Sequence, residues 1–297
     1  MIHVNQRLLL RENIAGSFLM ILSMAAFAGE DSVIKALSEW LPVSQVIFMI
    51  GIGGSIIFAS SGLFLKKEIL QPEINSKPMH ARIITEIFGR IFYSLALALT
   101  PLSTTTMILQ ATPLIVVAGA AIFFRERVGV TRWLAIALGF FGVMVIIWPD
   151  QNEITLFSVL AVLGMLGFAM RDLASRAAPS KLNIFTLGWH GFLSLALAGL
   201  ILSILLQQPF KLLPRETWLL LIAGIFFGVL GYGALISAMR VGEVSAITPF
   251  RYTRLIFGLS IGHFIFNEKV ATSSLFGCFI IVLSSLVVLY PKKASHS

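Results

Sequence analysis

The apolar residues of this chain fall into ten long stretches that are separated by short polar connections. A helix that crosses a bilayer needs roughly 20 mostly apolar residues, and each stretch approaches that length. Together they predict an all-α integral membrane protein with ten transmembrane helices. The connections leave no room for a separate soluble domain, so we expect any site to lie between helices. The stretches cover residues 14–36, 44–65, 82–99, 103–124, 131–148, 155–174, 183–206, 216–239, 244–266 and 272–290.

The composition agrees with lipid as the main solvent of this chain. Hydrophobic residues make up 57% of the 297 residues and charged residues 12%, and the mean hydropathy of +0.92 lies outside the range of soluble domains. The first stretch has the length of a full span and lacks a small-residue cleavage site, so we expect a first helix and not a removed signal peptide. The only cysteine, Cys278, excludes an internal disulfide and a cysteine metal cluster.

The positions of the basic residues predict the topology. Cytoplasmic loops of membrane proteins carry an excess of Lys and Arg. With the N-terminus inside, the outer side carries only Lys35, Lys211, Arg215 and Lys269. We therefore expect both termini in the cytoplasm, a multi-pass protein of the cell inner membrane, and no nucleic-acid partner despite the net charge of +8. The inner side carries Arg7, Arg11, Lys66, Lys67, Lys77, Arg82, Arg125, Arg127, Arg132, Arg176, Lys181, Arg240, Lys292 and Lys293.

The chain contains an internal repeat. The segment LMILSMAAFAGEDSVIKAL in the first half aligns with LAVLGMLGFAMRDLASRAA in the second at an offset of 141 residues. Asp31 then matches Asp172, and each is followed one helical turn later by a basic residue, Lys35 or Arg176. At an offset of 142, LSTTT matches VSAIT and FFRERV matches IFNEKV. Such self-similarity indicates two copies of one structural unit.

Each unit contains five helices, and because five is odd the second unit enters the membrane from the opposite side. The sequence therefore predicts two inverted five-helix repeats, residues 1–150 and 151–297. In transporters, inverted repeats place the substrate site near the midplane between the two units, and one unit rocks against the other to give alternating access.

Two arginines lie deep in the ninth stretch. A charge at the bilayer centre costs about 2.5–3.5 kcal/mol on insertion scales, so such a residue usually faces a cavity or a partner. Arg251 and Arg254 are spaced i, i+3 and share a helical face, with Tyr252 between them and Pro249 nearby to bend the helix. A guanidinium matches the geometry of a carboxylate, which predicts a substrate site here. The alternative is that each arginine pairs with an acid on another helix.

The repeat is asymmetric at this point. The residues that match Arg251, Tyr252 and Arg254 in the first half are Leu109, Gln110 and Thr112. A scaffold needs the two halves to match, whereas an asymmetric substrate needs the two walls of its pocket to differ. We therefore expect the last two to be neutral substrate contacts on the opposite wall.

The third stretch carries Glu86 and Arg90 at i, i+4, and Tyr93 one turn further on. Glu86 and Arg90 form an intrahelical pair or, alternatively, Glu86 titrates or exchanges partners with the arginines of the ninth helix during transport. Tyr93 adds a hydroxyl to the substrate face. His190 in the seventh stretch is a candidate for proton coupling, because histidine titrates near neutral pH, although a packing role is the alternative.

Asp31 and Asp172 are related by the repeat and so lie toward opposite membrane faces. With the basic residue one turn after each, they predict matched gates at the two ends of the pathway, which we favour over substrate contact. Their preceding residues, Glu30 and Arg171, differ in sign between the halves. No feature of the sequence explains that difference.

The chain resembles the ten-helix EamA-type family of drug/metabolite transporters over nearly its whole length. The resemblance rests on the two five-helix units, on LTPLSTTTMILQATPLIVVAGAAIFFRERVG in the first half, and on VSAITPFRYTRLIFGLSIGHFIFNEKV in the second. Glu126 and Glu268, at the ends of the fourth and ninth helices, match a recurring glutamate. The resemblance implies a secondary transporter, mostly an exporter of amino-acid-like metabolites. ITPFRYTRLIFG resembles a subgroup that includes S-adenosylmethionine and metallophore transporters.

Two other function classes remain as alternatives. A membrane-embedded enzyme needs a catalytic or metal constellation, and the chain has no HExxH motif, no Gly-rich phosphate loop and no DxD-like cluster. A channel needs a pore ring or a filter loop within the span, and neither is evident in the sequence. We therefore expect no enzyme activity, no cofactor and no metal. The expected partners are a small-molecule substrate and the lipid bilayer, with the chain a monomer or weak homodimer.

Overall fold

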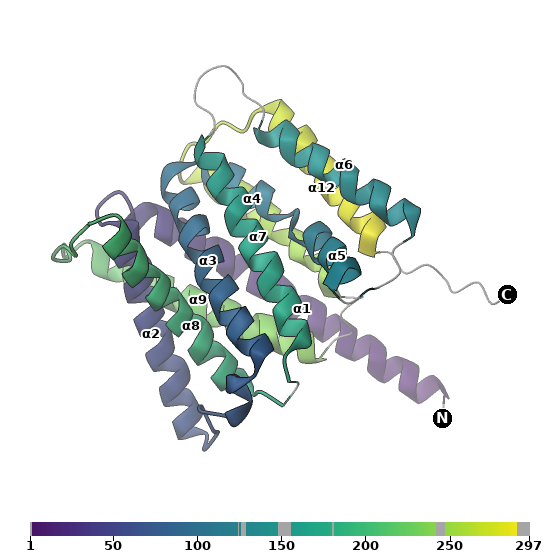
Figure 1. The fold of residues 1–297 in the computed structure, drawn as a ribbon, viewed down its shortest axis with the longest axis horizontal. Coiled ribbons are helices and arrows are strands. Elements are labelled where there is room, and N and C mark those ends of the chain that lie inside the picture. Colours follow the sequence, from purple (N-terminus) through teal and green to yellow (C-terminus); the bar gives the residue numbers. More distant parts are fainter. Residues whose placement is uncertain are drawn as a thin grey trace.

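The structure is a computed structural model that describes residues 2–123, 125, 129–147, 156–179, 181–241 and 247–289. Every regular element in these residues is a helix (Figure 1). Glu126, Arg127, Lys292 and Lys293 lie outside the described residues. The elements are α1 (Ile2–Leu37), α2 (Val43–Phe64), η1 (Pro72–Asn75), α3 (Lys77–Leu99), α4 (Leu102–Leu109), α5 (Thr112–Phe123), α6 (Val130–Ile147), α7 (Leu156–Ala177), α8 (Ile184–Leu205), α9 (Thr217–Val241), η2 (Thr248–Tyr252), α11 (Thr253–Phe264) and α12 (Thr272–Leu289).

The fourth and ninth predicted spans are both interrupted. The fourth divides into α4 and α5 at Gln110, because Pro113 has no N–H to donate and its ring crowds the carbonyl one turn earlier. Thr112 Oγ1 donates to the Leu109 carbonyl at 2.5 Å and so satisfies one group freed by the break. The ninth contains the 3-10 helix η2, which includes Pro249, before α11 begins. Interrupted backbone at membrane depth is tolerated where it is buried in protein or lines a cavity.

The long helices pack in pairs that join distant parts of the sequence. α1 packs along α9, α2 along α8, α3 along α7 and α6 along α12. In Figure 1, α6 and α12 lie together at one edge of the bundle, and α2 and α8 lie at the opposite edge. α4 packs against α11 between these pairs. The interrupted helices therefore occupy the middle of the bundle.

Small residues allow the paired helices to approach closely. A Cβ added at Gly51 of α2 would collide with the backbone nitrogen of Ala196 in α8, and one at Gly167 of α7 would lie 2.5 Å from the Gly89 Cα of α3. Glycine at such contacts is typical of helix packing in membranes. By contrast, a Cβ at Gly233 of α9 would have no such atom within 4 Å. The glycines of the paired faces therefore set the distance between helices.

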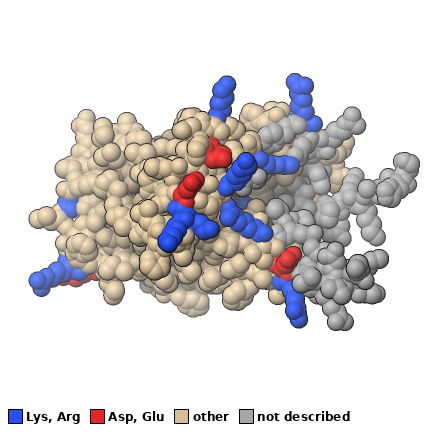
Figure 2. Space-filling view, turned by 90° about the horizontal axis from the view of Figure 1, so that it is seen from below, with Lys and Arg blue, Asp and Glu red and all other residues tan. Residues whose placement is uncertain are grey.

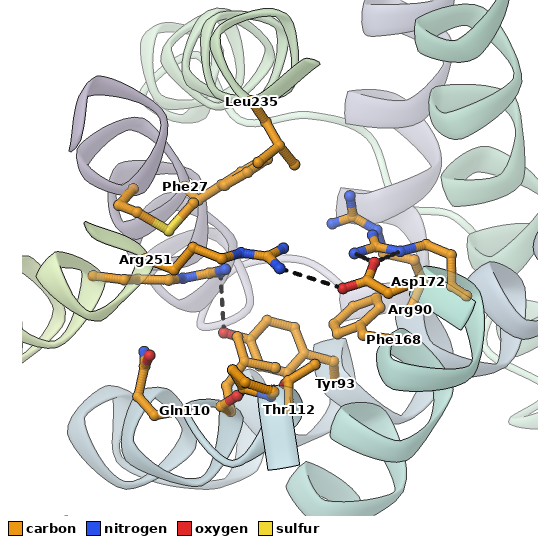
Figure 3. A pocket seen from close by; sticks show the side chains of 14 residues that line it. Phe27, Arg90, Tyr93, Gln110, Thr112, Phe168, Asp172, Leu235 and Arg251 are labelled. Carbon is orange, nitrogen blue, oxygen red and sulfur yellow. Dashed lines mark hydrogen bonds and ion pairs between the residues drawn. The ribbon is translucent and has the colours of Figure 1, made fainter. Parts of the chain in front are cut away.

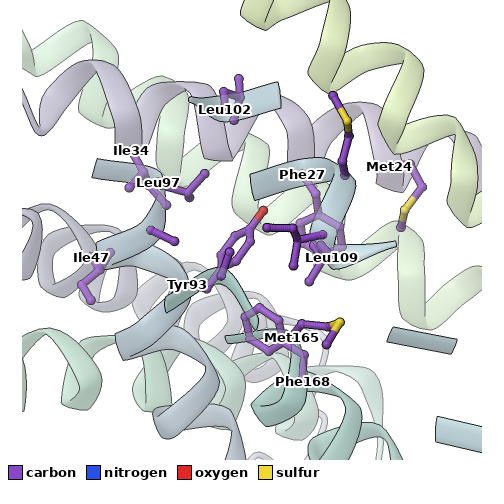
Figure 4. Packing of buried hydrophobic residues seen from close by; sticks show 14 of the residues in the cluster. Met24, Phe27, Ile34, Ile47, Tyr93, Leu97, Leu102, Leu109, Met165 and Phe168 are labelled. Carbon is purple, nitrogen blue, oxygen red and sulfur yellow. The ribbon is translucent and has the colours of Figure 1, made fainter. Parts of the chain in front are cut away.

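The core lies between the helices and the outer surface is apolar. Figure 4 shows Phe27, Tyr93, Leu109 and Phe168 meeting in the buried cluster. Many large apolar side chains instead point outward, including Phe64, which is 88% exposed. Figure 2 shows that large areas of one face carry no charged side chain, with a group of basic and acidic residues near its centre. An exposed apolar belt of this size is the surface that a bilayer covers.

Within the described residues, six segments are long and apolar enough to cross a membrane, as judged by length and composition. α6 and α12 contribute shorter apolar helices, Trp133–Ile146 and Thr272–Ser284. The predicted all-helical, multi-pass membrane protein is therefore confirmed.

Candidate functional site

A polar cavity of about 80 Å³ lies in the middle of the bundle. One buried water needs roughly 10–15 Å³, so this space has room for several waters, whereas a metabolite needs a wider one. Its apolar walls are Met24, Phe27, Leu109, Pro113, Phe168 and Leu235. Its polar walls are Arg90, Tyr93, Gln110, Thr112, Arg171, Asp172, Arg251 and Arg254.

The two interrupted spans present the predicted residues to this cavity. Arg251 lies in η2 and Arg254 in the first turn of α11, and both line the cavity. Gln110, at the break between α4 and α5, and Thr112, the first residue of α5, line it as well. Figure 3 shows the labelled side chains Arg251, Gln110, Thr112 and Asp172 arranged around one space. The asymmetric positions of the repeat therefore meet in one place.

Arg254 pairs with Asp31 of α1. Its Nη2 lies 2.5 Å from Asp31 Oδ2, and the Tyr93 hydroxyl donates to the same oxygen at 2.9 Å. The guanidinium also sits 5.3 Å from the centre of the Phe27 ring, a favourable cation–π position. Asp31 itself is 2% exposed, and the cavity lining does not include it. Arg254 Nη2 also donates to the Tyr93 hydroxyl at 3.3 Å, so Asp31, Tyr93 and Phe27 all hold this side chain.

Lys35 has other partners than Asp31, and the gate role of Asp31 stays a prediction. Lys35 Nζ donates to the Thr100 carbonyl at 2.7 Å and lies 3.8 Å from Glu268 Oε1. Lys35 stands one turn beyond Asp31, where α1 is about to end and the start of α4 is in reach. Tertiary contacts therefore override the i, i+4 spacing.

Glu86 of α3 lies among three arginines. Its carboxylate is 3.5 Å from Arg82, 3.5 Å from Arg90 and 3.3 Å from Arg171. The Glu86–Arg90 intrahelical pair is confirmed. The expected exchange partners on the ninth helix are not in contact with Glu86 here, and Arg171 of α7 takes that place. Glu86 is fully buried, so these arginines supply the compensating charge.

The contacts of Glu86 extend to a larger group. Arg171 donates to Asp172 Oδ1 at 2.8 and 3.0 Å, and Arg251 Nη1 lies 3.4 Å from Asp172 Oδ2. Arg90 Nη1 lies 4.0 Å from Glu30 Oε1. We call the seven connected residues the Glu86 network: Glu30, Arg82, Glu86, Arg90, Arg171, Asp172 and Arg251.

Sequence reasoning missed several of these residues. Hydropathy places Arg82 at the cytoplasmic flank, but α3 begins at Lys77, which puts Arg82 inside the bundle at 5% exposure with Ser175 and Tyr232 as hydrogen-bond partners. The opposite charges of Glu30 and Arg171 are now explained, because Arg171 meets Glu86 whereas Glu30 meets Arg90. The sign difference was the signal that pointed to them.

Besides Asp31 and Glu86, the predicted residues Tyr252 and His190 are absent from the cavity lining. Tyr252 is buried and is absent from the cavity walls. His190 of α8 is also buried, and its Nδ1 lies 2.8 Å from the Thr186 carbonyl of the preceding turn. The His190 contact is typical of a packing residue in a membrane helix, where polar groups need a partner.

Glu268 binds the beginning of α4. Its carboxylate accepts hydrogen bonds from Leu102 N at 2.6 Å, Ser103 N at 2.9 Å and Ser103 Oγ at 2.7 Å. The first N–H groups of a helix have no intrahelical acceptor, and a carboxylate there is favoured by the helix dipole. With Lys35, Glu268 thus ties together the end of α1, the start of α4 and the segment after α11.

The described residues provide little for catalysis. They contain no group of three or more His, Cys, Asp or Glu side chains that could hold a metal ion. The segment GLSIG at residues 258–262 has the spacing of a serine-nucleophile motif. That motif requires a sharp strand-to-helix turn, whereas Ser260 lies inside α11. The motif therefore lacks its structural context.

Comparison with known proteins decides the class. The EamA-like transporter family matches residues 14–148 and again residues 156–290. The chain belongs to the EamA-like transporter family. The two matches cover most of the sequence, so this EamA protein is a transporter and not an enzyme.

Individual relatives of this EamA protein carry different substrate names. The S-adenosylmethionine uptake transporter of Rickettsia conorii is 26% identical over 288 residues, covering 96% of this chain and 95% of the relative. The riboflavin transporter of Vibrio cholerae is 28% identical over 211 residues, 68% of each chain. The pseudopaline exporter CntI of Pseudomonas aeruginosa is 21% identical over 285 residues, 94% of this chain and 97% of the relative.

A crystal structure supports the fold. Its chain superposes with a TM-score of 0.62 at 18% sequence identity, and the match covers 93% of this chain and 96% of that one. At this identity the likeness shows the arrangement of helices alone.

Proposed function

We propose that this EamA protein is a secondary transporter that carries a small polar metabolite with an amino-acid-like carboxylate across the cell inner membrane by alternating access. The observation that carries the proposal is the charge of the cavity wall. Among the described residues, four arginines line it, namely Arg90, Arg171, Arg251 and Arg254, together with one aspartate, Asp172. An anionic group that enters this space finds guanidinium donors matched to its shape.

The names of the Rickettsia relatives favour this substrate class, whereas the relatives named as riboflavin transporters carry a compound without a carboxylate. S-adenosylmethionine carries an amino-acid carboxylate, and relatives at 25–26% identity over more than 90% of the chain are named as its uptake transporters. Another relative is named as an exporter. The sequence resemblance favours export, and in a secondary carrier the net direction follows the gradients of the substrate and of any coupled ion.

Alternating access is supported by the pairing of helices. The repeat matches α1 with α7 and α3 with α9. The contact of α3 with α7 therefore corresponds to the contact of α9 with α1, and both contacts exist. Gly89 packs against Phe168 and Gly231 against Phe27, and the two phenylalanines occupy equivalent repeat positions. Such exchange symmetry is what two inverted units, 1–150 and 151–297, would produce. In Figure 1 the start of α1 and the end of α12 point to the same side, in keeping with two cytoplasmic termini.

Counterflow in proteoliposomes tests the proposal. Vesicles loaded with unlabelled S-adenosylmethionine should accumulate the labelled compound transiently, because a carrier exchanges substrate across the membrane whereas a channel only equilibrates it. Decarboxylated S-adenosylmethionine and riboflavin, which lack the carboxylate, should exchange poorly, and Arg215→Ala at the exposed α8–α9 connection serves as the control variant. Equal transport with and without the carboxylate, or transport without counterflow, would reject the proposal.

A further inference from the structure

The two arginines from the ninth span are not equivalent. We propose that Arg251 is the residue that binds the substrate carboxylate, that the substrate displaces Asp172 from it, and that Arg254 remains the fixed partner of Asp31. This inference rests on the proposed function. It names which arginine changes partners and which internal carboxylate competes with the substrate.

The contact distances separate the two pairs. Arg251 Nη1 lies 3.4 Å from Asp172 Oδ2, whereas Arg254 Nη2 lies 2.5 Å from Asp31 Oδ2. Charge-assisted hydrogen bonds are usually about 2.7–2.9 Å long, so the Arg251 contact is loose. The Arg251 side chain is also more exposed, 26% against 14% for Arg254.

The consequence of breaking each pair also differs. Asp172 keeps two hydrogen bonds from Arg171 when Arg251 leaves. Asp31, with a side chain only 3% exposed, would keep only the Tyr93 hydroxyl among the bonds described here. Removing one partner of a buried ion pair is strongly unfavourable because a charge is left without compensation. The Arg251–Asp172 contact is therefore the one that can open at low cost.

The balance of positive and negative side chains in the Glu86 network also favours Arg251 as the residue that binds the carboxylate. The Glu86 network contains four arginines (Arg82, Arg90, Arg171 and Arg251) against three carboxylates (Glu30, Glu86 and Asp172), a surplus of one positive charge. Arg254 and Asp31 are balanced one to one. Buried charges are favourable only when they are paired. One substrate carboxylate brings the network to four against four.

The remaining cavity arginines are tied more firmly than Arg251. Arg171 contacts both Glu86 and Asp172, and Arg90 contacts Glu86 and Glu30. Arg251 has one ion-pair partner, Asp172, among the described residues. Of the four guanidinium groups that line the cavity, that of Arg251 is the one most free to turn toward a ligand.

Equilibrium binding of S-adenosylmethionine and of its decarboxylated form to the purified protein tests the inference. Asp172→Asn should bind S-adenosylmethionine roughly two- to fivefold more tightly. The substitution removes the weak Arg251–Asp172 ion pair, which competes with the substrate carboxylate for Arg251. The decarboxylated form should not gain, and Asp31→Asn should not tighten binding of either probe. A tighter binder made by removing a carboxylate is not expected from a merely structural role.

The arginine variants supply the second readout. Arg251→Ala should bind S-adenosylmethionine about ten- to a hundredfold more weakly, the loss of one charged hydrogen-bonded contact, and should no longer prefer it over the decarboxylated form. Arg254→Lys, chosen to keep the charge beside Asp31, should retain that preference. Arg215→Ala should match the wild type.

The outcomes distinguish a wrong assignment to Arg251 from a wrong substrate class. If wild type prefers the carboxylate but Asp172→Asn binds no more tightly, or if Arg254→Lys loses the preference, the assignment to Arg251 is wrong and the proposed function stands. If the wild type shows no preference, including no binding of either probe, the carboxylate substrate class fails and the inference fails with it.

Discussion

Substitution of Glu86 should destabilise the protein more than substitution of any other member of the Glu86 network, and substitution of Arg90 should be tolerated better. Glu86 is fully buried with three guanidinium groups 3.3–3.5 Å away. At an effective dielectric constant of about 20, each such attraction is worth about 5 kcal/mol before desolvation is subtracted. Loss of one partner from a buried ion pair has a net cost of about 3–5 kcal/mol. Glu86→Gln leaves three buried arginines with less compensation, so we expect a loss in this range.

Arg90→Gln should be milder, at about 1–2 kcal/mol, for a reason specific to this structure. Glu86 retains Arg82 and Arg171, the surplus positive charge of the network disappears, and the contact that buried Glu30 loses is a long one of 4.0 Å. The double variant should be less unstable than the sum of the single changes, as for residues in contact.

The assay is the free energy of unfolding in mixed detergent micelles, followed by tryptophan fluorescence as SDS is added, with Arg215→Ala as the surface control. A Glu86→Gln protein as stable as the wild type would refute the reasoning. So would an Arg90→Gln protein at least as unstable as Glu86→Gln, because the charge surplus would then have no energetic meaning.

Three further predictions follow from the packing and the topology. Glu268→Ala should destabilise the protein by about 0.5–2 kcal/mol, the range for a lost helix cap, and more than Ser103→Ala does in the same unfolding assay; equal effects would contradict the capping role. Gly51→Leu should separate α2 from α8 and abolish folded monomer on size-exclusion chromatography, whereas Gly233→Ala, which meets no atom within 4 Å, should be neutral. Reporter fusions at the two termini should both report the cytoplasm, and an external C-terminus would remove the inverted repeat.

The sequence predicts much of the architecture because hydropathy and repetition are local patterns. The apolar stretches indicate the helices, and the offset between the two halves matches Gln110 and Thr112 with Tyr252 and Arg254. The prolines beside these residues indicate the interruptions that turn Gln110, Thr112 and Arg254 toward the cavity. The cavity is therefore largely predictable from the pattern of polar residues within apolar stretches.

Long-range partners were not predictable in the same way. Lys35 stands at the right spacing for Asp31, yet the partner of Asp31 is Arg254, 223 positions away in the sequence. Which of several arginines reaches a given carboxylate depends on the rotation of each helix about its own axis. The contacts of Arg82 were not predictable for a related reason, because its own charge lowers the local hydropathy and hides the first turns of α3.

Accessibility of the cavity from both sides of the membrane tests the central claim most directly. The chain has one cysteine, Cys278, which is buried. In a Cys278→Ala background, Thr112→Cys places a thiol of similar size at the cavity wall, and Ser194→Cys, buried within α8, is the matched control.

An impermeant maleimide would be applied to right-side-out and to inverted vesicles in turn. We expect the thiol at position 112 to react from each side and S-adenosylmethionine to slow this reaction. The thiol at position 194 should react from neither side. Reaction of the thiol at position 112 from one side only, with substrate gradients imposed in both directions, would contradict alternating access through this cavity.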